Sequence, residues 1–280
     1  MVAARGCQVG RAVRTPLERS AGWADYLRDY HAARPGITEA VITRSTHPDA
    51  GTPYQWVVAA LPVSPGTVVD LACGSAPLQQ HLPPGTGYVG LDLSEPELRA
   101  GVRVGRSALA VADVERLPLT DASVDAVTCS MAIMLFDRLD LVLDEVARVL
   151  RPGGTFATIR PAGRPFDLSD LLHVLPLAVG LGRPPQLPHR YRSRTVARLL
   201  RERGLHLARD EALRFAFPLE GPADAHLAVQ ALYLPDVPPV RRRRAADLLA
   251  RTAGAGRSLP VSVRRTVATR VVELDARGDR

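Results

Sequence analysis

Hydrophobic periodicity divides the chain into a helical front part and a longer part in which strands and helices alternate. Trp23, Leu27 and Tyr30 recur at the spacing of one helix face, which predicts a helix over about 18–33. Two more helical stretches, at about 37–45 and 47–61, precede the first strand. The run TVVDLAC lacks polar alternation, as is typical of a strand buried on both faces. The predicted strands lie at 67–73, 87–93, 108–114, 123–133, 155–161, 205–217 and 261–274.

Helical patterns lie between many of these strands. A helix is predicted to start near 78–82, and Ser94 with Glu97 three residues later predicts a capping box for the next helix. Further helices are predicted at 139–150, 166–182, 194–204 and 240–254. This alternation indicates an α/β fold with a Rossmann-like, doubly wound parallel sheet. We divide the chain into an N-terminal helical cap, 1–60, and a domain, 61–280, with a helical insertion at about 164–194.

The composition is that of a globular protein with an unusual basic content. The chain has 280 residues, of which 46% are hydrophobic, and all 36 basic residues are Arg. With 29 acidic residues the formal net charge is +7, a balance that suits acidic partners such as nucleic acid but that also follows from GC-rich coding. Three cysteines exclude a disulfide framework and a four-cysteine zinc site, and no metal site is predicted. Cys73 and Cys129 are expected to be buried.

Targeting signals are not evident in the sequence. The N-terminus is basic without a continuous apolar region, and no apolar run approaches the roughly 18 residues of a membrane span. We therefore expect a cytoplasmic protein without a membrane partner.

Acidic residues end the first three predicted strands: Asp70, Asp92 and Asp113. In an open parallel sheet, ligands bind at this carboxyl edge. A carboxylate after the second strand can accept hydrogen bonds from both hydroxyls of a ribose, and one after the third can accept from an exocyclic amine. The small residues after Asp70 allow close backbone approach, and a following helix N-terminus favours a negative ligand group. Of a dinucleotide fingerprint only Gly74 remains, which argues against a pyrophosphate. S-adenosylmethionine has the required groups.

Four segments carry a family resemblance. VVDLACGSA, YVGLDLS, ADVERLPLTDASVDAV and RVLRPGG together resemble a class I S-adenosylmethionine-dependent methyltransferase over about 54–161. The resemblance implies a seven-stranded sheet with an antiparallel last strand. It also implies that Asp70, Ala72 and Gly74 contact the methionine part of the cofactor, Asp92 the ribose and Leu93 the adenine ring. Asp113 and the backbone of Val114 would face the adenine amine, and Ser130 and Met131 would line the reacting edge. Ala72 and Ala76 stand where the family usually has glycines.

The catalytic residue is not determined by the sequence. The sulfonium is already activated, so methyl transfer depends mainly on positioning, and a general base is needed only when the acceptor must lose a proton. Candidate bases are His31, His47, His189 and Tyr191, none with a partner that the sequence reveals. Tyr30 and Tyr54 are candidates for ligand contact, although most aromatic residues before the first strand are expected to pack in a core.

The favoured function is methyl transfer to O, N or C of a small-molecule acceptor. The lysine-free, arginine-rich composition is typical of an actinomycete-like source, where such enzymes act in secondary metabolism. A nucleic-acid methyltransferase, including one for RNA, is favoured by the charge and by VRRRR, but CSMAI differs from the Asn/Asp-Pro-Pro-aromatic motif of base-amine methyltransferases. A non-methylating cyclase or isomerase, or a cofactor-binding partner protein, is a further alternative. A nicotinamide-dependent oxidoreductase is weakened by the missing glycines. The oligomeric state stays open.

Overall fold

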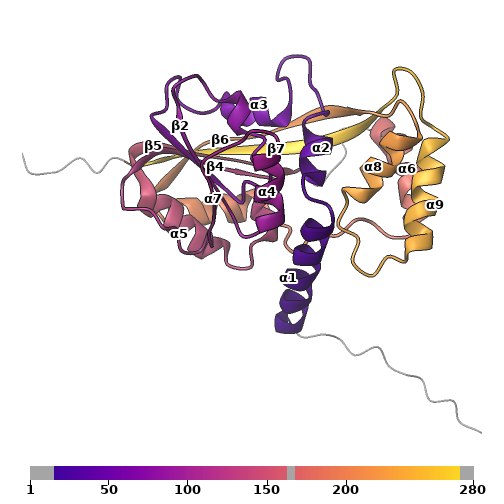
Figure 1. The fold of residues 1–280 in the computed structure, drawn as a ribbon, viewed down its shortest axis with the longest axis horizontal. Coiled ribbons are helices and arrows are strands. Elements are labelled where there is room, and N and C mark those ends of the chain that lie inside the picture. Colours follow the sequence, from indigo (N-terminus) through magenta and orange to yellow (C-terminus); the bar gives the residue numbers. More distant parts are fainter. Residues whose placement is uncertain (1–15, 163–167, 272–280) are drawn as a thin grey trace, which may run out of the picture.

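A single sheet forms the centre of the molecule (Figure 1). The structure is a computed structural model that describes residues 16–162 and 168–271. The strands are β1 (Thr67–Leu71), β2 (Gly87–Asp92), β3 (Leu109–Val111), β4 (Val124–Ser130), β5 (Leu150–Pro161), β6 (Leu205–Pro218) and β7 (Ser258–Arg270).

The strand order is β3-β2-β1-β4-β5-β7-β6 in one seven-stranded sheet. Strands β1 to β5 pair in parallel, whereas β7 is antiparallel to both of its neighbours, β5 and β6. The predicted α/β fold with an antiparallel last strand is therefore confirmed.

Helices cover both faces of this sheet. Successive residues of a strand point to opposite faces, so a buried strand contributes side chains to two cores. On β1, Val69 belongs to the core under α5 and α7, and Val68 belongs to the core under α3. Both valines are fully buried. The α-helices are α1 (Pro16–Ala33), α2 (Ile37–Ile42), α3 (Pro53–Val58), α4 (Glu95–Arg103), α5 (Leu139–Val149), α6 (Leu168–Leu181), α7 (Ser193–Arg201), α8 (Pro222–Gln230) and α9 (Pro239–Ala250).

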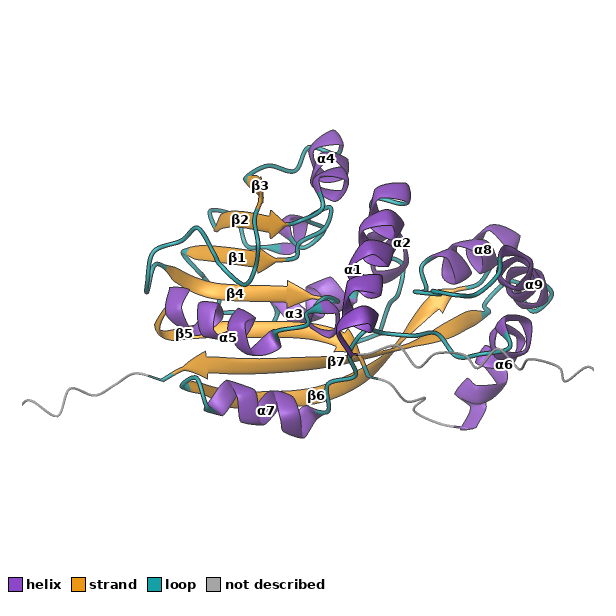
Figure 2. Cartoon of the chain, turned by 90° about the horizontal axis from the view of Figure 1, so that it is seen from below, coloured by secondary structure: helices purple, strands orange, loops and turns teal. Residues whose placement is uncertain are grey.

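The helical cap expected at 1–60 corresponds, in its described part, to α1, α2 and α3. Figure 2 shows α1 and α2 beside the ends toward which the arrows of β1, β2 and β4 point, so these helices lie at the carboxyl edge of the sheet. Residues 1–15 lie outside the described part of the chain. The domain boundaries remain predictions.

A helical lobe packs beside the end of β6 and the start of β7 (Figures 1 and 2). It consists of α6, α8 and α9, whose buried Leu181, Val229 and Ala245 share one apolar core. A Cβ at Gly180 would collide with Ala245, so the close approach of α6 and α9 requires glycine there. The predicted insertion supplies α6, apart from residues 163–167, which are not described. Helix α8 was not predicted.

Two local predictions are wrong. The expected helix after β1 is only one turn of 3₁₀ helix, η1 (Gln79–His81). Ala76 takes a φ of 61° before Pro77, and this left-handed backbone does not continue into an α-helix. Ser94 begins α4 without a side-chain capping bond, because Glu97 bonds His31 and the backbone of Gly36 instead.

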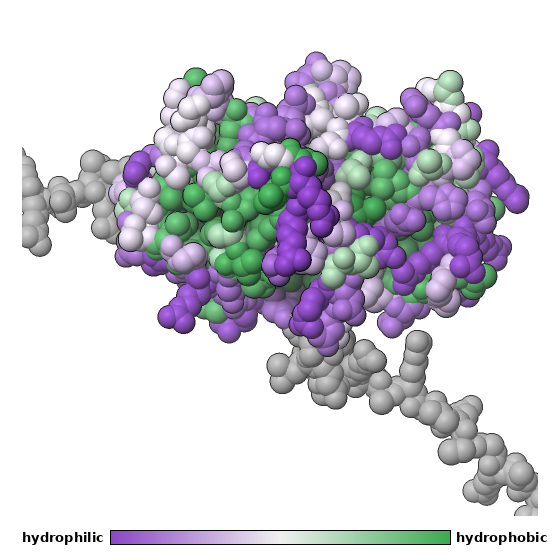
Figure 3. Space-filling model, in the orientation of Figure 1, coloured by the Kyte–Doolittle hydropathy of each residue, from purple (hydrophilic) through white to green (hydrophobic). Residues whose placement is uncertain are grey.

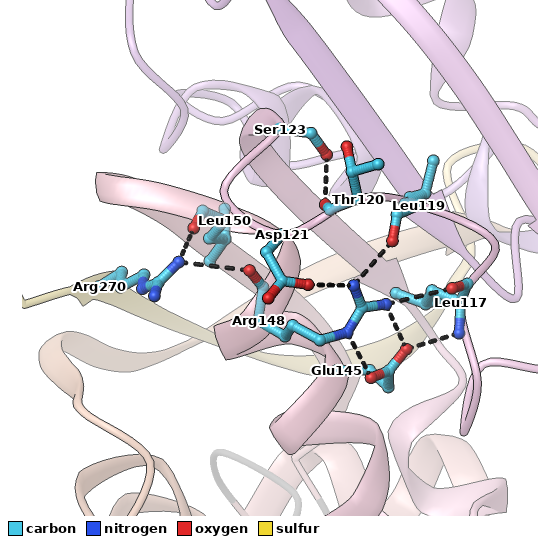
Figure 4. A network of polar contacts seen from close by, with 9 residues as sticks. All are labelled: Leu117, Leu119, Thr120, Asp121, Ser123, Glu145, Arg148, Leu150 and Arg270. Atoms are coloured by element: carbon cyan, nitrogen blue, oxygen red, sulfur yellow. Dashed lines mark hydrogen bonds and ion pairs between the residues drawn. The ribbon is translucent and has the colours of Figure 1, made fainter.

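The connection between β3 and β4 is held against α5 by one arginine (Figure 4). Arg148 donates to the carbonyl oxygens of Leu117 (3.1 Å) and Leu119 (2.7 Å) and to the carboxylates of Glu145 and Asp121 (each 2.7 Å). Hydrogen bonds to a charged group are stronger than neutral ones. The loop that starts at the end of β3 therefore has a fixed course.

Candidate functional site

A pocket of about 690 Å³ opens at the carboxyl ends of β1, β2 and β4. Its walls come from α1, α2, Tyr54 of α3, the loop after β1, residues 92–97, the segment after β4, and Tyr233 in the connection between α8 and α9. The location is the ligand edge that the topology of an open α/β sheet predicts. The volume is in the range of small-molecule sites, roughly 300–1,000 Å³.

The loop after β1 turns sharply beneath this pocket. Ala72, Gly74 and Ala76 have φ values of 49°, 57° and 61°, the left-handed region that favours glycine. The two alanines therefore keep the backbone shape that glycines would give, at a cost of roughly 1–2 kcal/mol each. A Cβ placed on Gly74 would meet only Glu97 Oε2, at 3.8 Å. The backbone of Gly74 consequently leaves room for a ligand.

Asp92 and Leu93 form a second wall of the pocket. The Asp92 carboxylate accepts hydrogen bonds from the backbone N–H groups of Gly74 and Ser94, both at 2.7 Å. Burial raises the pKa of Asp92, and these two N–H groups partly offset that effect. Leu93 is 67% exposed although it is a large apolar side chain. This pair can hold a polar diol beside a flat apolar ring.

Ser130 and Met131 end β4 at the floor of the pocket. The Ser130 hydroxyl is buried and makes no hydrogen bond within the part of the chain that the structure describes. Met131 has a φ of 58°, fixed by its N–H bond to the Ile159 carbonyl (2.7 Å). A buried hydroxyl without a partner is uncommon in folded proteins.

A cluster around Glu39 joins α2 to the loop after β1. Arg106 forms an ion pair with Glu39 and donates to the Ser75 carbonyl (2.6 Å), while the Ser75 hydroxyl donates to Glu39 (2.5 Å). Burial raises the pKa of Glu39, but the hydrogen bonds from Arg106 and Ser75 outweigh it and lower the pKa. Glu39 is therefore a bound carboxylate that fixes the cap to the loop.

His31 lines the opposite wall, on α1. Its Nδ1 lies 2.8 Å from Glu97 Oε1 and its Nε2 lies 3.2 Å from the Tyr233 hydroxyl. Burial raises the pKa of Tyr233, so this hydroxyl is protonated at neutral pH. Among the proposed bases, His31 is placed where it can reach a ligand.

Eight of the sequence candidates lie on the pocket surface: His31, Tyr54, Ala72, Gly74, Asp92, Leu93, Ser130 and Met131. Their roles toward a cofactor or a substrate remain predictions.

Several other candidates lie outside the pocket lining, and their contacts with a ligand remain predictions. The Asp70 carboxylate is buried under the loop, where it accepts from Tyr88 (3.1 Å) and Thr128 (2.8 Å). Asp113 accepts from the Glu115 N–H (2.9 Å) in a local turn. The Val114 side chain packs in the core beneath α5. Tyr30 is buried in the cap and donates to the Gln230 carbonyl (2.8 Å).

The remaining base candidates also lie outside the pocket lining. His189 pairs with Asp137 (2.7 Å), and Tyr191 donates to the Phe136 carbonyl (2.9 Å). Both therefore support the segment around η2 (Ile133–Leu135), which does line the pocket. His47 packs against Phe215.

Sequence reasoning missed Tyr233, Leu135, Phe136 and the role of Glu97. No local pattern marks Tyr233, because it reaches the pocket from a connection 202 positions after His31. The spacing of Glu97 from Ser94 was a signal in the sequence, but it was interpreted as a capping box.

No cluster of three or more metal-ligating side chains occurs among the described residues. Over the same ranges, no helix has the length and apolar character required to cross a membrane.

Comparison with known proteins identifies a methyltransferase domain over residues 69–158. Over 120 residues the chain is 38% identical to a malonyl-[acyl-carrier protein] O-methyltransferase of Methylococcus capsulatus, a match covering 37% of this chain and 44% of that protein. Over 99 residues it is 38% identical to a ubiquinone/menaquinone biosynthesis C-methyltransferase of Acidiphilium cryptum, covering 32% and 40%. The chain thus spans less than half the length of these two relatives.

A chain in the Haloferax volcanii complex that contains the Trm112 methyltransferase activator has a similar fold. Its TM-score is 0.54 at 24% identity, and the match covers 88% of this chain and 97% of that one.

Proposed function

Because the chain carries a class I methyltransferase domain, we propose that it transfers the methyl group of S-adenosylmethionine to O, N or C of a small-molecule acceptor. The observation that supports this most directly is the pairing of Asp92 with the exposed Leu93 at the end of β2, in one pocket with Gly74 after β1 and Ser130 at the end of β4. Three separate strand ends thus present groups suited to different parts of one ligand.

The residues of the pocket fit this cofactor. Asp92 would accept from the ribose hydroxyls, and the exposed side chain of Leu93 would pack on the adenine ring. Gly74 leaves space for the methionine part, and Ser130 would line the reacting edge of the same pocket. The bound cofactor supplies an electrophilic methyl group on a sulfonium, so the protein has mainly to align the acceptor with it.

A small acceptor suits the rest of the pocket. Leu27, Leu135 and Phe136 provide apolar wall beyond the part assigned to the cofactor. The two relatives named above are, by their names, methyltransferases of a malonyl group on a carrier protein and of a quinone precursor. We propose an acceptor with an apolar body, and secondary metabolism in the cytoplasm as its setting.

Nucleic acid is disfavoured as the acceptor. The run Arg241–Arg244 lies on α9, which contributes no residue to the pocket lining. Figure 3 shows hydrophilic residues gathered over α9, which suits a solvated helix face. A cyclase or isomerase that keeps the cofactor as a scaffold would use the same pocket without consuming the methyl group.

Calorimetric titration with S-adenosylhomocysteine tests the proposal. We expect micromolar binding by the wild-type protein and at least about tenfold weaker binding by Asp92→Asn, which is about 1.4 kcal/mol. Asp247→Asn, an exposed carboxylate on α9, is the matched control and should bind as the wild type does. Absence of binding by the wild type would contradict the proposed function. Consumption of S-adenosylmethionine in the presence of an acceptor would distinguish methyl transfer from the scaffold alternative.

A further inference from the structure

Three polar side chains from distant segments meet on one wall of the pocket. His31 comes from α1, Glu97 from the first turn of α4, and Tyr233 from the connection between α8 and α9. The imidazole bridges the other two, with Nδ1 at 2.8 Å from the carboxylate and Nε2 at 3.2 Å from the hydroxyl. This arrangement is more specific than a single histidine in a cleft.

The hydrogen bonds determine which nitrogen of His31 is basic. Glu97 is only 4% exposed, and its second oxygen accepts from the Gly36 N–H at 2.7 Å. A carboxylate accepts only, so Nδ1 carries the proton in this bond, and Nε2 has a free electron pair toward Tyr233. A carboxylate, an imidazole and a hydroxyl in this order form a unit in which the imidazole takes up a proton.

We infer that His31 is the general base of this pocket and that the Tyr233 hydroxyl passes it the proton of an acceptor hydroxyl. The inference rests on the proposed methyl transfer. The acceptor O–H bond breaks as its proton moves to the Tyr233 oxygen, and the Tyr233 proton moves to His31 Nε2. The acceptor oxygen then forms a bond to the methyl carbon while the carbon–sulfur bond breaks, which leaves S-adenosylhomocysteine and an imidazolium paired with Glu97.

The base indicates the class of acceptor. A carboxylic acid is already ionised at neutral pH and needs no base, whereas a phenol has a pKa of about 10 and does. An ammonium acceptor would need a carboxylate, but Asp92 is assigned to the ribose and Glu95 pairs with Arg99. Glu97 and Glu39 each accept from two protein donors. The apolar walls suit a neutral ring. The acceptor is therefore a phenol or an enol, methylated on oxygen.

The role of the unprotonated His31 Nε2 gives the direction in which methyl transfer depends on pH. Glu97 of α4 and Asp92 of β2 are the acidic groups that act on it, Tyr233 faces Nε2, and Tyr30 packs against the ring from its own helix. Protonation at Nε2 removes the electron pair that accepts the proton. Methylation of a phenol must consequently fall as the pH decreases.

His31→Gln tests the inference, because glutamine can retain a hydrogen bond but cannot act as a base. The probes are phenol, 1-naphthol and the more acidic 4-nitrophenol, with methyl transfer measured by product mass. For phenol and 1-naphthol we expect kcat to fall about 100-fold, and for 4-nitrophenol, which is largely ionised, only a few-fold. Affinity for S-adenosylhomocysteine should not change.

Two further variants complete the design. Tyr233→Phe should lower kcat for phenol about tenfold and also spare 4-nitrophenol, which provides a second test if His31→Gln does not fold. His226→Gln changes an exposed histidine on α8 and is the control for histidine loss.

Equal losses for phenol and 4-nitrophenol, or a loss confined to cofactor affinity, would overturn the assignment of His31 as base. If the wild type binds S-adenosylhomocysteine but methylates none of the three probes, the acceptor class is wrong while the proposed function stands. Failure of that binding would instead contradict the proposed function itself.

Discussion

At the scale of single residues, burial separates the aspartates at the strand ends into different roles. Asp70 and Asp92 both lie near the carboxyl ends of neighbouring strands, but Asp70 is 1% exposed and is bonded by two side chains. Asp92 lines the pocket and is bonded by backbone N–H groups. Burial raises the pKa of Asp70 to about 6. Asp70 is therefore a structural carboxyl group with a measurable effect on stability.

Asp70→Asn should change the pH dependence of stability. An unfolded aspartate has a pKa of about 3.9, so between about pH 4 and pH 6 the folded state binds more protons than the unfolded state. The Asp70 contribution is therefore present below about pH 4 and is lost as the pH rises to about 6. Relative to the wild type, the variant should gain about 3 kcal/mol of unfolding free energy between pH 4 and pH 7.

Urea denaturation at intervals of one pH unit measures this difference. The exposed Asp247→Asn is the control, and its curve should run parallel to that of the wild type. A parallel curve for Asp70→Asn would show that Asp70 is ionised throughout this range.

The sequence was sufficient to place the strand-end residues but not to orient them. Asp70, Asp92 and Asp113 all lie at or just beyond the carboxyl ends of strands, as predicted, yet of the three only Asp92 lines the pocket. The orientation depends on partners such as Tyr88 and Thr128, which lie 18 and 58 positions away in the chain. A pattern of consecutive residues carries no information on these contacts.

At the scale of elements, the strands were predicted from their apolar runs, but the helix starts depended on competing bonds. Thr52 and Gln55 form a complete capping box at α3. Ser94 and Glu97 have the spacing of such a box and do not form it, because His31 and the Gly36 N–H compete for the carboxylate. A capping motif therefore predicts a helix start but not the actual bond.

Alanine substitutions at the two N-caps should differ in cost. Thr52→Ala removes a side-chain acceptor for the Gln55 N–H (3.2 Å) and should lower the free energy of unfolding by about 1 kcal/mol. Ser94→Ala removes no capping bond and should cost at most a few tenths of a kcal/mol. Denaturant unfolding of the two variants beside the wild type measures the difference. Equal costs would mean that Ser94 caps α4 in solution.

At the scale of the whole molecule, the pocket depends on how the cap is held against the sheet. Two acidic side chains do this: Glu97 of α4 reaches the cap at His31 and Gly36, and Glu39 of α2 reaches Arg106 and Ser75. The loop after β1, the cap and the α8–α9 connection are thereby joined through one pocket. These contacts could not be predicted from the sequence, because the residues that make them are separated by 31 to 202 positions.

Arg106 offers the most direct test of the coupling between the cap and the loop after β1. Its side chain is 10% exposed, and its guanidinium bonds both Glu39 in α2 and the Ser75 carbonyl in the loop after β1. In Arg106→Gln both contacts weaken, and each bond to a charged group contributes about 1.5–3 kcal/mol. Hydrogen exchange should therefore become at least about tenfold faster in residues 37–42 and 72–77 together. Exchange in α9, at the other end of the molecule, should stay as in the wild type.

The control for this experiment is Arg99→Gln. Arg99 lies on α4 and pairs with Glu95, but its side chain is 65% exposed, so its loss should leave exchange in both segments unchanged. Saturation with S-adenosylhomocysteine should restore protection in the Arg106 variant, because a ligand that contacts both the loop and the cap stabilises the closed arrangement. If exchange accelerates only in residues 72–77, the cap and the loop after β1 open independently, and the pocket is not a single cooperative unit.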